Sequence, residues 1–500
     1  MEIGIILAVI IGIVSFIRFK RKPDNYNALI KRGSAHNKKG DYDLAITNYT
    51  EALKIKPNDY KSLVFRGKAY CCRGDFDRAI ADYTEALKIK PDDYEILKLR
   101  GNAYTNKDDF DRAIADFTEV IKIVPDDYYA LHCRGWAYDA KDDFDSAIAD
   151  YTEALNILFN RGNAYATEGD FDSANAYYIE ALNILFNRGI AYATKGDYVS
   201  AIADYTEALK IKPDDYNTLI ERGSVYRKNG DFDSAIADYT EALKIKPDDY
   251  EILNIRGLAY YEEGCLDPSN AYDAKGYFDR AIADYTEVLK IKPDDYDILI
   301  SCYVMHSMKG DFDRAIADCT KILKIIPNGD EIMYYRGLAY YDKGDFDSAI
   351  ADYTEALKIK PDGYDILYNR GNAYAAKGDY VSAIADYTTI LKIKPDAYKV
   401  LNHRGIAHVK NGDFDRAIED YTEALKIKPD DDYILYNYKI PYNYNNTLYN
   451  RGNAYVAKGD FDLAIKDFET ILKINPDNVE AKENLEKIRQ IKDFQILETK

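Results

Sequence analysis

The sequence predicts an all-α solenoid, a stack of helical hairpins, on three observations. An Arg-Gly dipeptide returns along the chain, most often at intervals of 34 residues. Within each interval, two segments carry apolar residues at helical spacing. Gly or Asn followed by Asp separates the two segments and Pro ends the second, and these residues stop one helix and start the next. A fixed period of this size is typical of a protein built from stacked repeats.

The repeat at residues 216–249 shows the pattern most clearly. Gly230 ends its first helix, and Pro247 ends its second. Gly223 lies inside the first helix, where glycine costs about 1 kcal/mol relative to alanine. We therefore expect a close helix crossing there, with Tyr239 packed over the bare backbone. Because one hairpin cannot bury its apolar faces alone, neighbouring hairpins must stack.

The Arg-Gly spacing divides the chain into thirteen units, of which one, the ninth, has Cys302-Tyr303 in place of Arg-Gly. The units lie near residues 26–59, 60–93, 94–127, 128–154, 155–181, 182–215, 216–249, 250–295, 296–329, 330–363, 364–397, 398–431 and 445–478. A capping helix and tail are expected over residues 479–500, because one face there is apolar amid charged residues.

Four irregularities interrupt the array. The fourth and fifth units lack the Pro-Asp-Asp connection, and only Asn156 and Asn183 remain there as helix caps. We hypothesise that the second helix of one unit fuses with the first helix of the next at both places. Insertions occupy residues 265–276 and 432–444. The first contains Asp-Pro-Ser-Asn and is expected to form an exposed loop.

These units resemble the tetratricopeptide repeat (TPR) family over about residues 26–478. The residues that match in the clearest unit are Leu219, Gly223, Tyr226, Ala235, Tyr239, Ala242 and Pro247. The resemblance implies a right-handed superhelix whose first helices line a concave groove for partner proteins. Arg222 departs from the family, which usually has a large apolar residue there, and its charge is expected to be satisfied by an acid such as Asp238.

Composition argues against several functions. The net charge is −19, whereas a nucleic-acid partner would require a basic stripe. The six cysteines form no C-x-x-C pair, the five histidines have no metal-ligand spacing, and no phosphate-binding loop is present. The carboxylates recur with the repeat, as expected for solvated helix faces. The sequence therefore predicts no enzyme activity, no cofactor, no metal and no small-molecule substrate.

Residues 1–22 differ from the rest of the chain. Residues 3–17 are apolar without interruption, and Arg18, Lys20, Arg21 and Lys22 follow. This pattern predicts a single transmembrane anchor with the repeats on the cytoplasmic side. A cleaved signal peptide fits less well, because no positive charge precedes the apolar segment. A helix buried in the protein is the other alternative.

The resemblance implies that partner contacts come from first-helix positions three before, one after and four after the Gly. The candidates are Lys98, Asn102, His132, Trp136, Asp139, Phe159, Asn163, Phe186, Arg227, Tyr334, Tyr341, Tyr368 and Asn372. The alternative for each is a purely packing role. Lys98 and Asn102 also resemble the start of a clamp for peptide carboxylates, but Cys133 stands where that clamp requires Asn, so it is incomplete.

The sequence thus predicts a membrane-anchored, non-enzymatic scaffold that binds partner proteins or peptides in a groove. A targeting receptor or co-chaperone adaptor is one alternative, and a regulatory subunit of an enzyme complex is another. The partner, the biological process and the oligomeric state are not indicated by the sequence.

Overall fold

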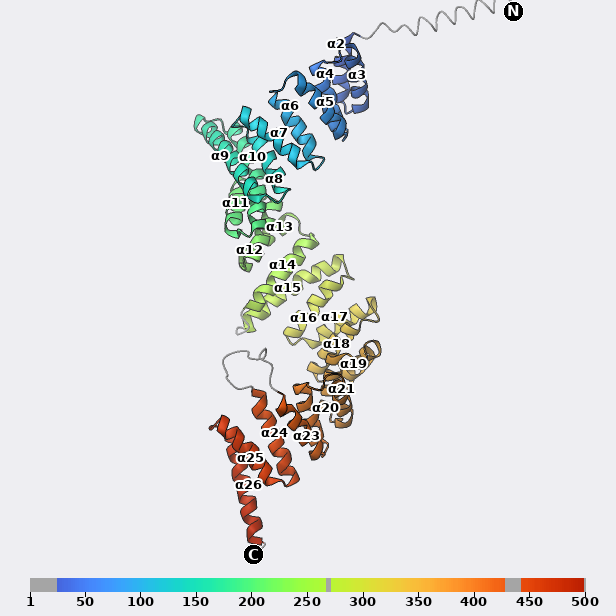
Figure 1. The fold of residues 1–500 in the computed structure, drawn as a ribbon, viewed down its shortest axis with the longest axis vertical. Coiled ribbons are helices and arrows are strands. Elements are labelled where there is room, and N and C mark those ends of the chain that lie inside the picture. The colour runs from blue at the N-terminus through green and yellow to red at the C-terminus, as the bar shows by residue number, and fades with distance from the viewer. Residues whose placement is uncertain (1–24, 267–270, 428–441, 499–500) are drawn as a thin grey trace, which may run out of the picture. The chain divides into compact units, whose positions relative to one another are not determined.

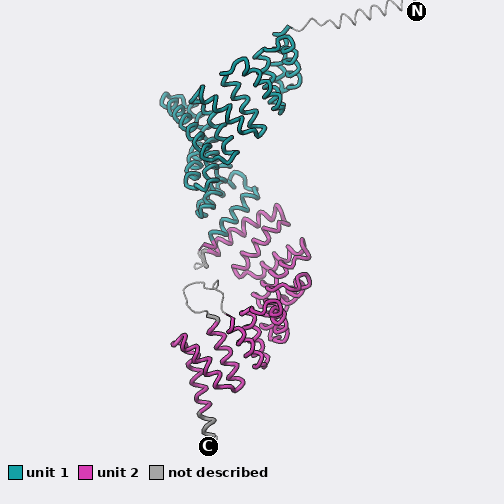
Figure 2. Tube along the Cα trace, in the orientation of Figure 1, with its two compact units in different colours: residues 1–263 teal, residues 264–500 magenta. Residues whose placement is uncertain are grey.

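The computed structural model describes residues 25–266, 271–427 and 442–498, and every regular element there is an α-helix (Figure 1). The chain divides into two compact parts, an N-terminal block of residues 1–263 and a C-terminal block of residues 264–500 (Figure 2). The boundary falls inside helix α14.

In the N-terminal block, first and second helices of hairpins alternate along most of the chain. The helices are α2 (Tyr26–Lys38), α3 (Tyr42–Ile55), α4 (Tyr60–Cys72), α5 (Phe76–Ile89), α6 (Tyr94–Thr105), α7 (Phe110–Ile123), α8 (Tyr128–Asp139), α9 (Phe144–Glu168), α10 (Phe171–Lys195), α11 (Tyr198–Ile211), α12 (Tyr216–Lys228), α13 (Phe232–Ile245) and α14 (Tyr250–Leu266).

The C-terminal block continues the alternation and ends in a longer helix. Its helices are α15 (Ala271–Ile291), α16 (Tyr296–Met308), α17 (Phe312–Ile325), α18 (Asp330–Lys343), α19 (Phe346–Ile359), α20 (Tyr364–Lys377), α21 (Tyr380–Ile393), α22 (Tyr398–Lys410), α23 (Phe414–Lys426), α24 (Tyr442–Lys458), α25 (Phe461–Ile474) and α26 (Val479–Glu498). Ala481, Leu485 and Ile488 bury one face of α26 in a cluster that includes Phe468 of α25.

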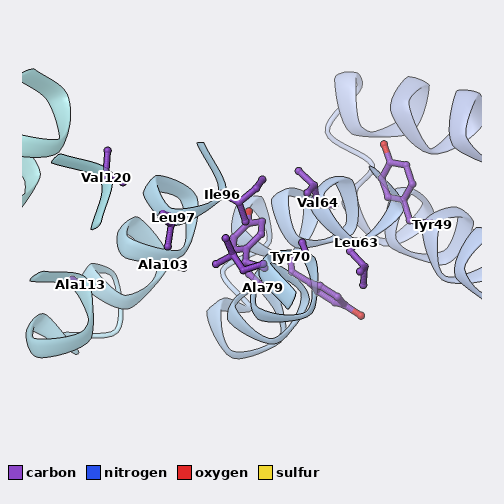
Figure 3. Close-up of a cluster of buried hydrophobic side chains, with 14 of the residues drawn as sticks. Tyr49, Leu63, Val64, Tyr70, Ala79, Ile96, Leu97, Ala103, Ala113 and Val120 are labelled. Atoms are coloured by element: carbon purple, nitrogen blue, oxygen red, sulfur yellow. The ribbon is translucent and has the colours of Figure 1, made fainter. Parts of the chain in front are cut away.

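The close crossing predicted at the glycine of the first helix is confirmed. A Cβ atom added at Gly223 would lie 2.7 Å from the ring of Tyr239, and that ring is fully buried. Gly33 and Tyr49 repeat the arrangement, with a Cβ-to-ring distance of 2.6 Å. Figure 3 shows Tyr49 in the core that the first hairpins share. Glycine is required because any side chain would enter the space of the tyrosine ring.

The arginine of the Arg-Gly dipeptide ties each hairpin together and joins it to the hairpin before. Arg222 Nε and Nη2 donate to the two carboxylate oxygens of Asp238 at 2.8 and 2.7 Å, as expected from the sequence. Its Nη1 donates to Thr206 Oγ1 of the preceding hairpin at 3.1 Å. The buried carboxylate therefore has a bidentate partner, and the same three contacts recur along the stack.

The hypothesis of fused helices is also confirmed. Helices α9 and α10 run unbroken through Asn156 and Asn183, each for 25 residues. They pack side by side and are joined at a turn in which Gly169 has a φ of +83°. Residues 157–182, the C-terminal part of α9 and the N-terminal part of α10, form a helical hairpin that we call the finger (Figure 1).

The finger lies outside the ladder of contacts that joins successive hairpins. Arg188 Nη1 donates to Thr152 Oγ1 of α9 at 2.9 Å, skipping the finger, although in regular pairs such as Arg222 and Thr206 the partners are 16 residues apart. Lys195 likewise forms an ion pair with Asp145. The fourth and sixth units are thus direct neighbours, and the fifth is not a stacked unit.

The first insertion differs from the expected loop. Cys265 and Leu266 belong to α14, and residues 271–276 form the first turns of α15, so the insertion lengthens two helices. Only residues 267–270 lie outside the described part. Of the second insertion, residues 442–444 begin α24, and residues 432–441 lie outside the described residues.

The predicted transmembrane helix is corrected. Within residues 25–266, 271–427 and 442–498, no helix is both long enough and apolar enough to cross a membrane, because charged side chains recur along these helices. The expected anchor at residues 1–22 lies outside the described residues. The described residues therefore form an all-α array of helical hairpins with no membrane-spanning helix among them, and the membrane location is not retained.

Candidate functional site

Within each block, most candidate residues lie on a face that we call the helix-A face: the side chains of the first helices at and beside the three positions chosen from the sequence. Successive first helices touch along this face. Asn369 Nδ2 donates to Tyr334 Oη at 3.0 Å, which joins α20 to α18. An equivalent contact of 3.0 Å joins Asn187 Nδ2 of α10 to His132 Nε2 of α8. These contacts hold neighbouring first helices side by side within each block.

The N-terminal end of the face is already internally paired. Lys98 Nζ lies 3.0 Å from carboxylate oxygens of both Asp127 and Glu95. Asn102 Nδ2 donates to Tyr129 Oη at 3.0 Å. Because two carboxylates of this chain balance the Lys98 ammonium, the resemblance to a carboxylate clamp has no open anion site there.

Helix α8 presents the largest exposed side chain of the face. Trp136 is 41 % exposed, and its indole contacts the ring of Phe110 edge-on at a centroid distance of 5.8 Å. Burial raises the pKa of Asp139, one turn further along, above its ordinary value. Burial lowers the pKa of His132. Since the Asn187 amide donates to its Nε2, His132 accepts as a neutral imidazole.

Four candidates lie on the finger or are held by side chains of their own or the next hairpin. Phe159 and Asn163 belong to the finger, where Tyr178 Oη donates to Asn163 Oδ1 at 2.7 Å. Phe186 packs against the ring of Tyr205, with a centroid distance of 5.9 Å. Arg227 of α12 pairs with Glu262 at 3.0 Å. The structure therefore does not bring all thirteen candidates into one continuous face.

In the C-terminal block, aromatic side chains gather on the helix-A face. Tyr334 and Tyr368 are half-buried, and burial raises the pKa of both hydroxyls. The Tyr341 ring packs on Phe346, with centroids 5.4 Å apart. Tyr387 Oη donates to Asn372 Oδ1 at 2.7 Å.

Sequence reasoning missed three members of this cluster. Asn369 and His403 stand two residues before the Gly, and the His403 ring meets that of Tyr368 edge-on at 5.3 Å. Tyr364 stacks on Tyr368 with a centroid distance of 6.4 Å. Extending the search to the position two before the Gly would have found the first two. We call Tyr334, Tyr341, Tyr364, Tyr368, Asn369 and His403 the aromatic patch.

The described residues offer little for metal chemistry. No group of three or more His, Cys, Asp or Glu side chains in residues 25–266, 271–427 and 442–498 is placed to hold a metal ion. Buried carboxylates of the ladder such as Asp238 are bound by an arginine of the same hairpin, and Asp318 is bound by His306 in its place. What the face presents instead is aromatic rings with polar tips, a composition typical of protein interfaces.

Comparison with repeat families gives matches along most of residues 26–478, with none over residues 296–336, which include the ninth unit. A model described as TPR repeat matches residues 67–108, 223–264 and 337–378. Two models described as tetratricopeptide repeat match further parts of the chain. One covers residues 26–59, 183–215, 364–397, 398–431 and 446–478. The other covers residues 94–127, 128–157, 155–184 and 269–295. Together the matches span more than half of the chain.

Solved structures with similar hairpins include several repeat proteins. A tetratricopeptide repeat protein from Parabacteroides merdae is 19 % identical, with 57 % of this chain and 99 % of that chain covered and a TM-score of 0.35. Yeast Tom70 is 17 % identical, with 91 % and 99 % covered and a TM-score of 0.31. MamA from Desulfovibrio magneticus RS-1 is 17 % identical, with 37 % and 98 % covered and a TM-score of 0.33. These scores are too low to carry any conclusion about function. No curated protein matches the sequence.

Proposed function

Because the chain belongs to the tetratricopeptide repeat family, we propose that it is a non-enzymatic scaffold that binds segments of partner proteins on its helix-A face. The observation that carries the proposal is the aromatic patch. Tyrosine rings provide large, rigid contact area at low entropic cost, and their hydroxyls accept or donate to a peptide backbone. Lys98 is engaged in internal ion pairs, which supports the choice of the patch and Trp136 as the main anchors in this proposal.

The net charge of −19 favours partner segments that are basic or neutral over acidic ones. A segment lying across α18, α20 and α22 would meet Tyr334, Tyr368 and His403 in turn, since these three belong to successive first helices. Such a segment would pack against the aromatic rings and form hydrogen bonds with the tyrosine hydroxyls and the histidine ring nitrogens. Aromatic anchors of this kind are typical of binding hot spots.

A random peptide library displayed on phage, panned against the full chain, tests this proposal. We expect enriched peptides whose affinity falls about 10-fold or more in Tyr334→Ala and Tyr368→Ala, because truncation of an anchoring aromatic residue typically costs this much. Val381→Ala is the matched control, since Val381 is 66 % exposed on a second helix, α21. Fluorescence anisotropy gives the affinities, and melting temperatures verify folding.

Two outcomes would overturn the proposal. One is the absence of any enriched peptide. The other is a set of peptides that bind wild type and both tyrosine variants equally well while losing affinity for Val381→Ala.

A further inference from the structure

The finger leaves uncovered a helix face that the rest of the stack covers. In a regular pair of hairpins, the first helix of the later hairpin lies on the second helix of the earlier one. Arg100 Nη1 donates to Thr84 Oγ1 at 3.2 Å, and Lys107 forms an ion pair with Asp77. Helix α18 makes the same two contacts with residues that both lie inside it: Arg336 donates to Thr320, and Lys343 pairs with Asp313. Because Arg336 and Lys343 are seven residues apart, two helical turns, both point from one face of the covering helix.

On the finger, the corresponding positions of α10 are Asp172 and Ile179, and no helix of the described residues covers them. The lysine that would pair with Asp172 is Lys195, which binds Asp145 instead. Ile179 is 53 % exposed, and within the described residues Asp172 is exposed without an ion-pair partner. Ala164 of α9 is also exposed, whereas the equivalent Ala103 of α6 is 1 % exposed.

The finger's sequence departs from other second helices at three positions. Asn175, Tyr177 and Ile179 stand where the second helix of the preceding unit has Ile, Asp and Thr. Exposure accounts for the change to Asn175, and Tyr177 stacks on Tyr165 with a centroid distance of 5.5 Å. The change from threonine to Ile179 instead puts an apolar side chain into solvent, and packing within this chain does not explain it.

We propose that this face of α10 docks a basic amphipathic helix of another protein. The docked helix runs antiparallel to α10, as the covering helix does in regular hairpins. It packs an apolar side chain against Ile179, at the position where an arginine of the covering helix bonds a threonine in the regular stack. Two turns later it places a lysine or arginine on Asp172, as Lys107 lies on Asp77 in the stack.

Charge favours a basic partner over a second copy of this chain. The exposed acids of the finger are Glu168, Asp170, Asp172 and Glu180. Its single cation, Arg161, is paired with Asp126 at 2.6 Å. Two fingers brought together would repel each other, and the net charge of −19 adds to this repulsion.

Binding of a synthetic helix to the full chain, with the charge reversed on either partner, tests the inference. The probe is a fluorescent alanine-rich helix with a leucine and, two turns later on the same face, a lysine; a second probe has glutamate in place of the lysine. We expect wild type to prefer the lysine probe about 5-fold, since a surface ion pair contributes up to about 1 kcal/mol. Asp172→Lys should reverse the preference. Ile179→Asp should lower the affinity for the lysine probe about 10-fold or more.

Two control variants make the same changes away from the finger. Asp248→Lys changes an exposed acid, and Val199→Asp changes a side chain that is 75 % exposed on α11. Both should leave the preference unchanged. The inference is overturned if Asp248→Lys reverses the preference as well, if wild type binds both probes equally, or if light scattering shows finger-dependent self-association in place of probe binding. Phage-derived peptides that bind the aromatic patch do not affect this result, so the two proposals fail separately.

Discussion

At the scale of single residues, the ninth unit shows what the hairpin crossing requires. Tyr303 occupies the usual glycine position there, and Cys319 occupies the usual tyrosine position; both are buried. The aromatic ring at this crossing thus comes from the first helix, not the second, and the side-chain volume that fills the crossing is kept. Cys302 replaces the arginine, and His306 Nδ1 bonds Asp318 at 2.7 Å in its place. What the crossing needs is one ring and one bound carboxylate, supplied by either helix.

Two Gly→Ala substitutions test the crossing directly. Gly223→Ala should destabilise its hairpin by about 1–3 kcal/mol, because the new methyl group would overlap the Tyr239 ring. Gly276→Ala in α15 is the control. Nothing lies within 4 Å of a Cβ atom there, so we expect a gain of about 0.5–1 kcal/mol. Thermal unfolding followed by circular dichroism checks both; equal melting temperatures for the two variants would contradict the close crossing.

At the scale of helices, the long helices α9 and α10 decide how the N-terminal block is joined. With the finger bypassed, α10 continues the face begun by α8, and the bond between Asn187 and His132 joins the two. This bond needs a neutral His132, because a protonated Nε2 could no longer accept from the amide.

This contact makes stability depend on pH in a defined direction. Burial holds the pKa of His132 below its ordinary value of about 6.5, so the unfolded chain takes up the proton first as pH falls. The stabilisation is complete above about pH 6.5 and is lost as pH falls toward the lower folded-state pKa. We expect the melting temperature of wild type to fall more steeply between about pH 7 and 5 than that of His132→Gln. Parallel curves would show that His132 does not titrate with unfolding.

Other groups act outside this comparison. His408, whose pKa is also lowered by burial, is present in both proteins and cancels in the difference. Burial raises the pKa of Asp82, Asp116, Asp204 and Asp238, which therefore favour the folded state as pH falls. Both wild type and His132→Gln contain these carboxylates, so their effect cancels in the difference between the two melting curves. Their ordinary pKa of about 3.9 also lies below the pH range compared.

At the scale of the molecule, the sequence was most informative where local signals and stacking agree. The hairpins, the glycine crossing and the partnership of Arg222 with Asp238 all follow from one repeat read alone. The fused helices followed from the loss of Pro-Asp-Asp, which removes the only stop signal. The place of the fifth unit could not be read in this way, because stacking is a relation between neighbours.

Two side chains carried a signal of the bypass that the count of Arg-Gly dipeptides overlooked. In a stacked fifth unit, Glu168 would lie against Asp145, which puts like charges where most other units have a lysine and an aspartate. It would also offer Ile179 to Arg188, where other units have a threonine. The candidate site was predicted less well, since polar pairing within the face, as at Lys98, depends on side chains of adjacent helices.

The claim on which both the joined stack and the uncovered finger depend is that the fourth and sixth units touch. Carbodiimide links carboxylates to amines only where they form an ion pair, and mass spectrometry of the digested full chain identifies the linked peptides. Asp145 with Lys195 is the pair expected from the structure. A link between Asp172 and Lys195 in its place would contradict the account, because it would put the fifth unit back into the stack.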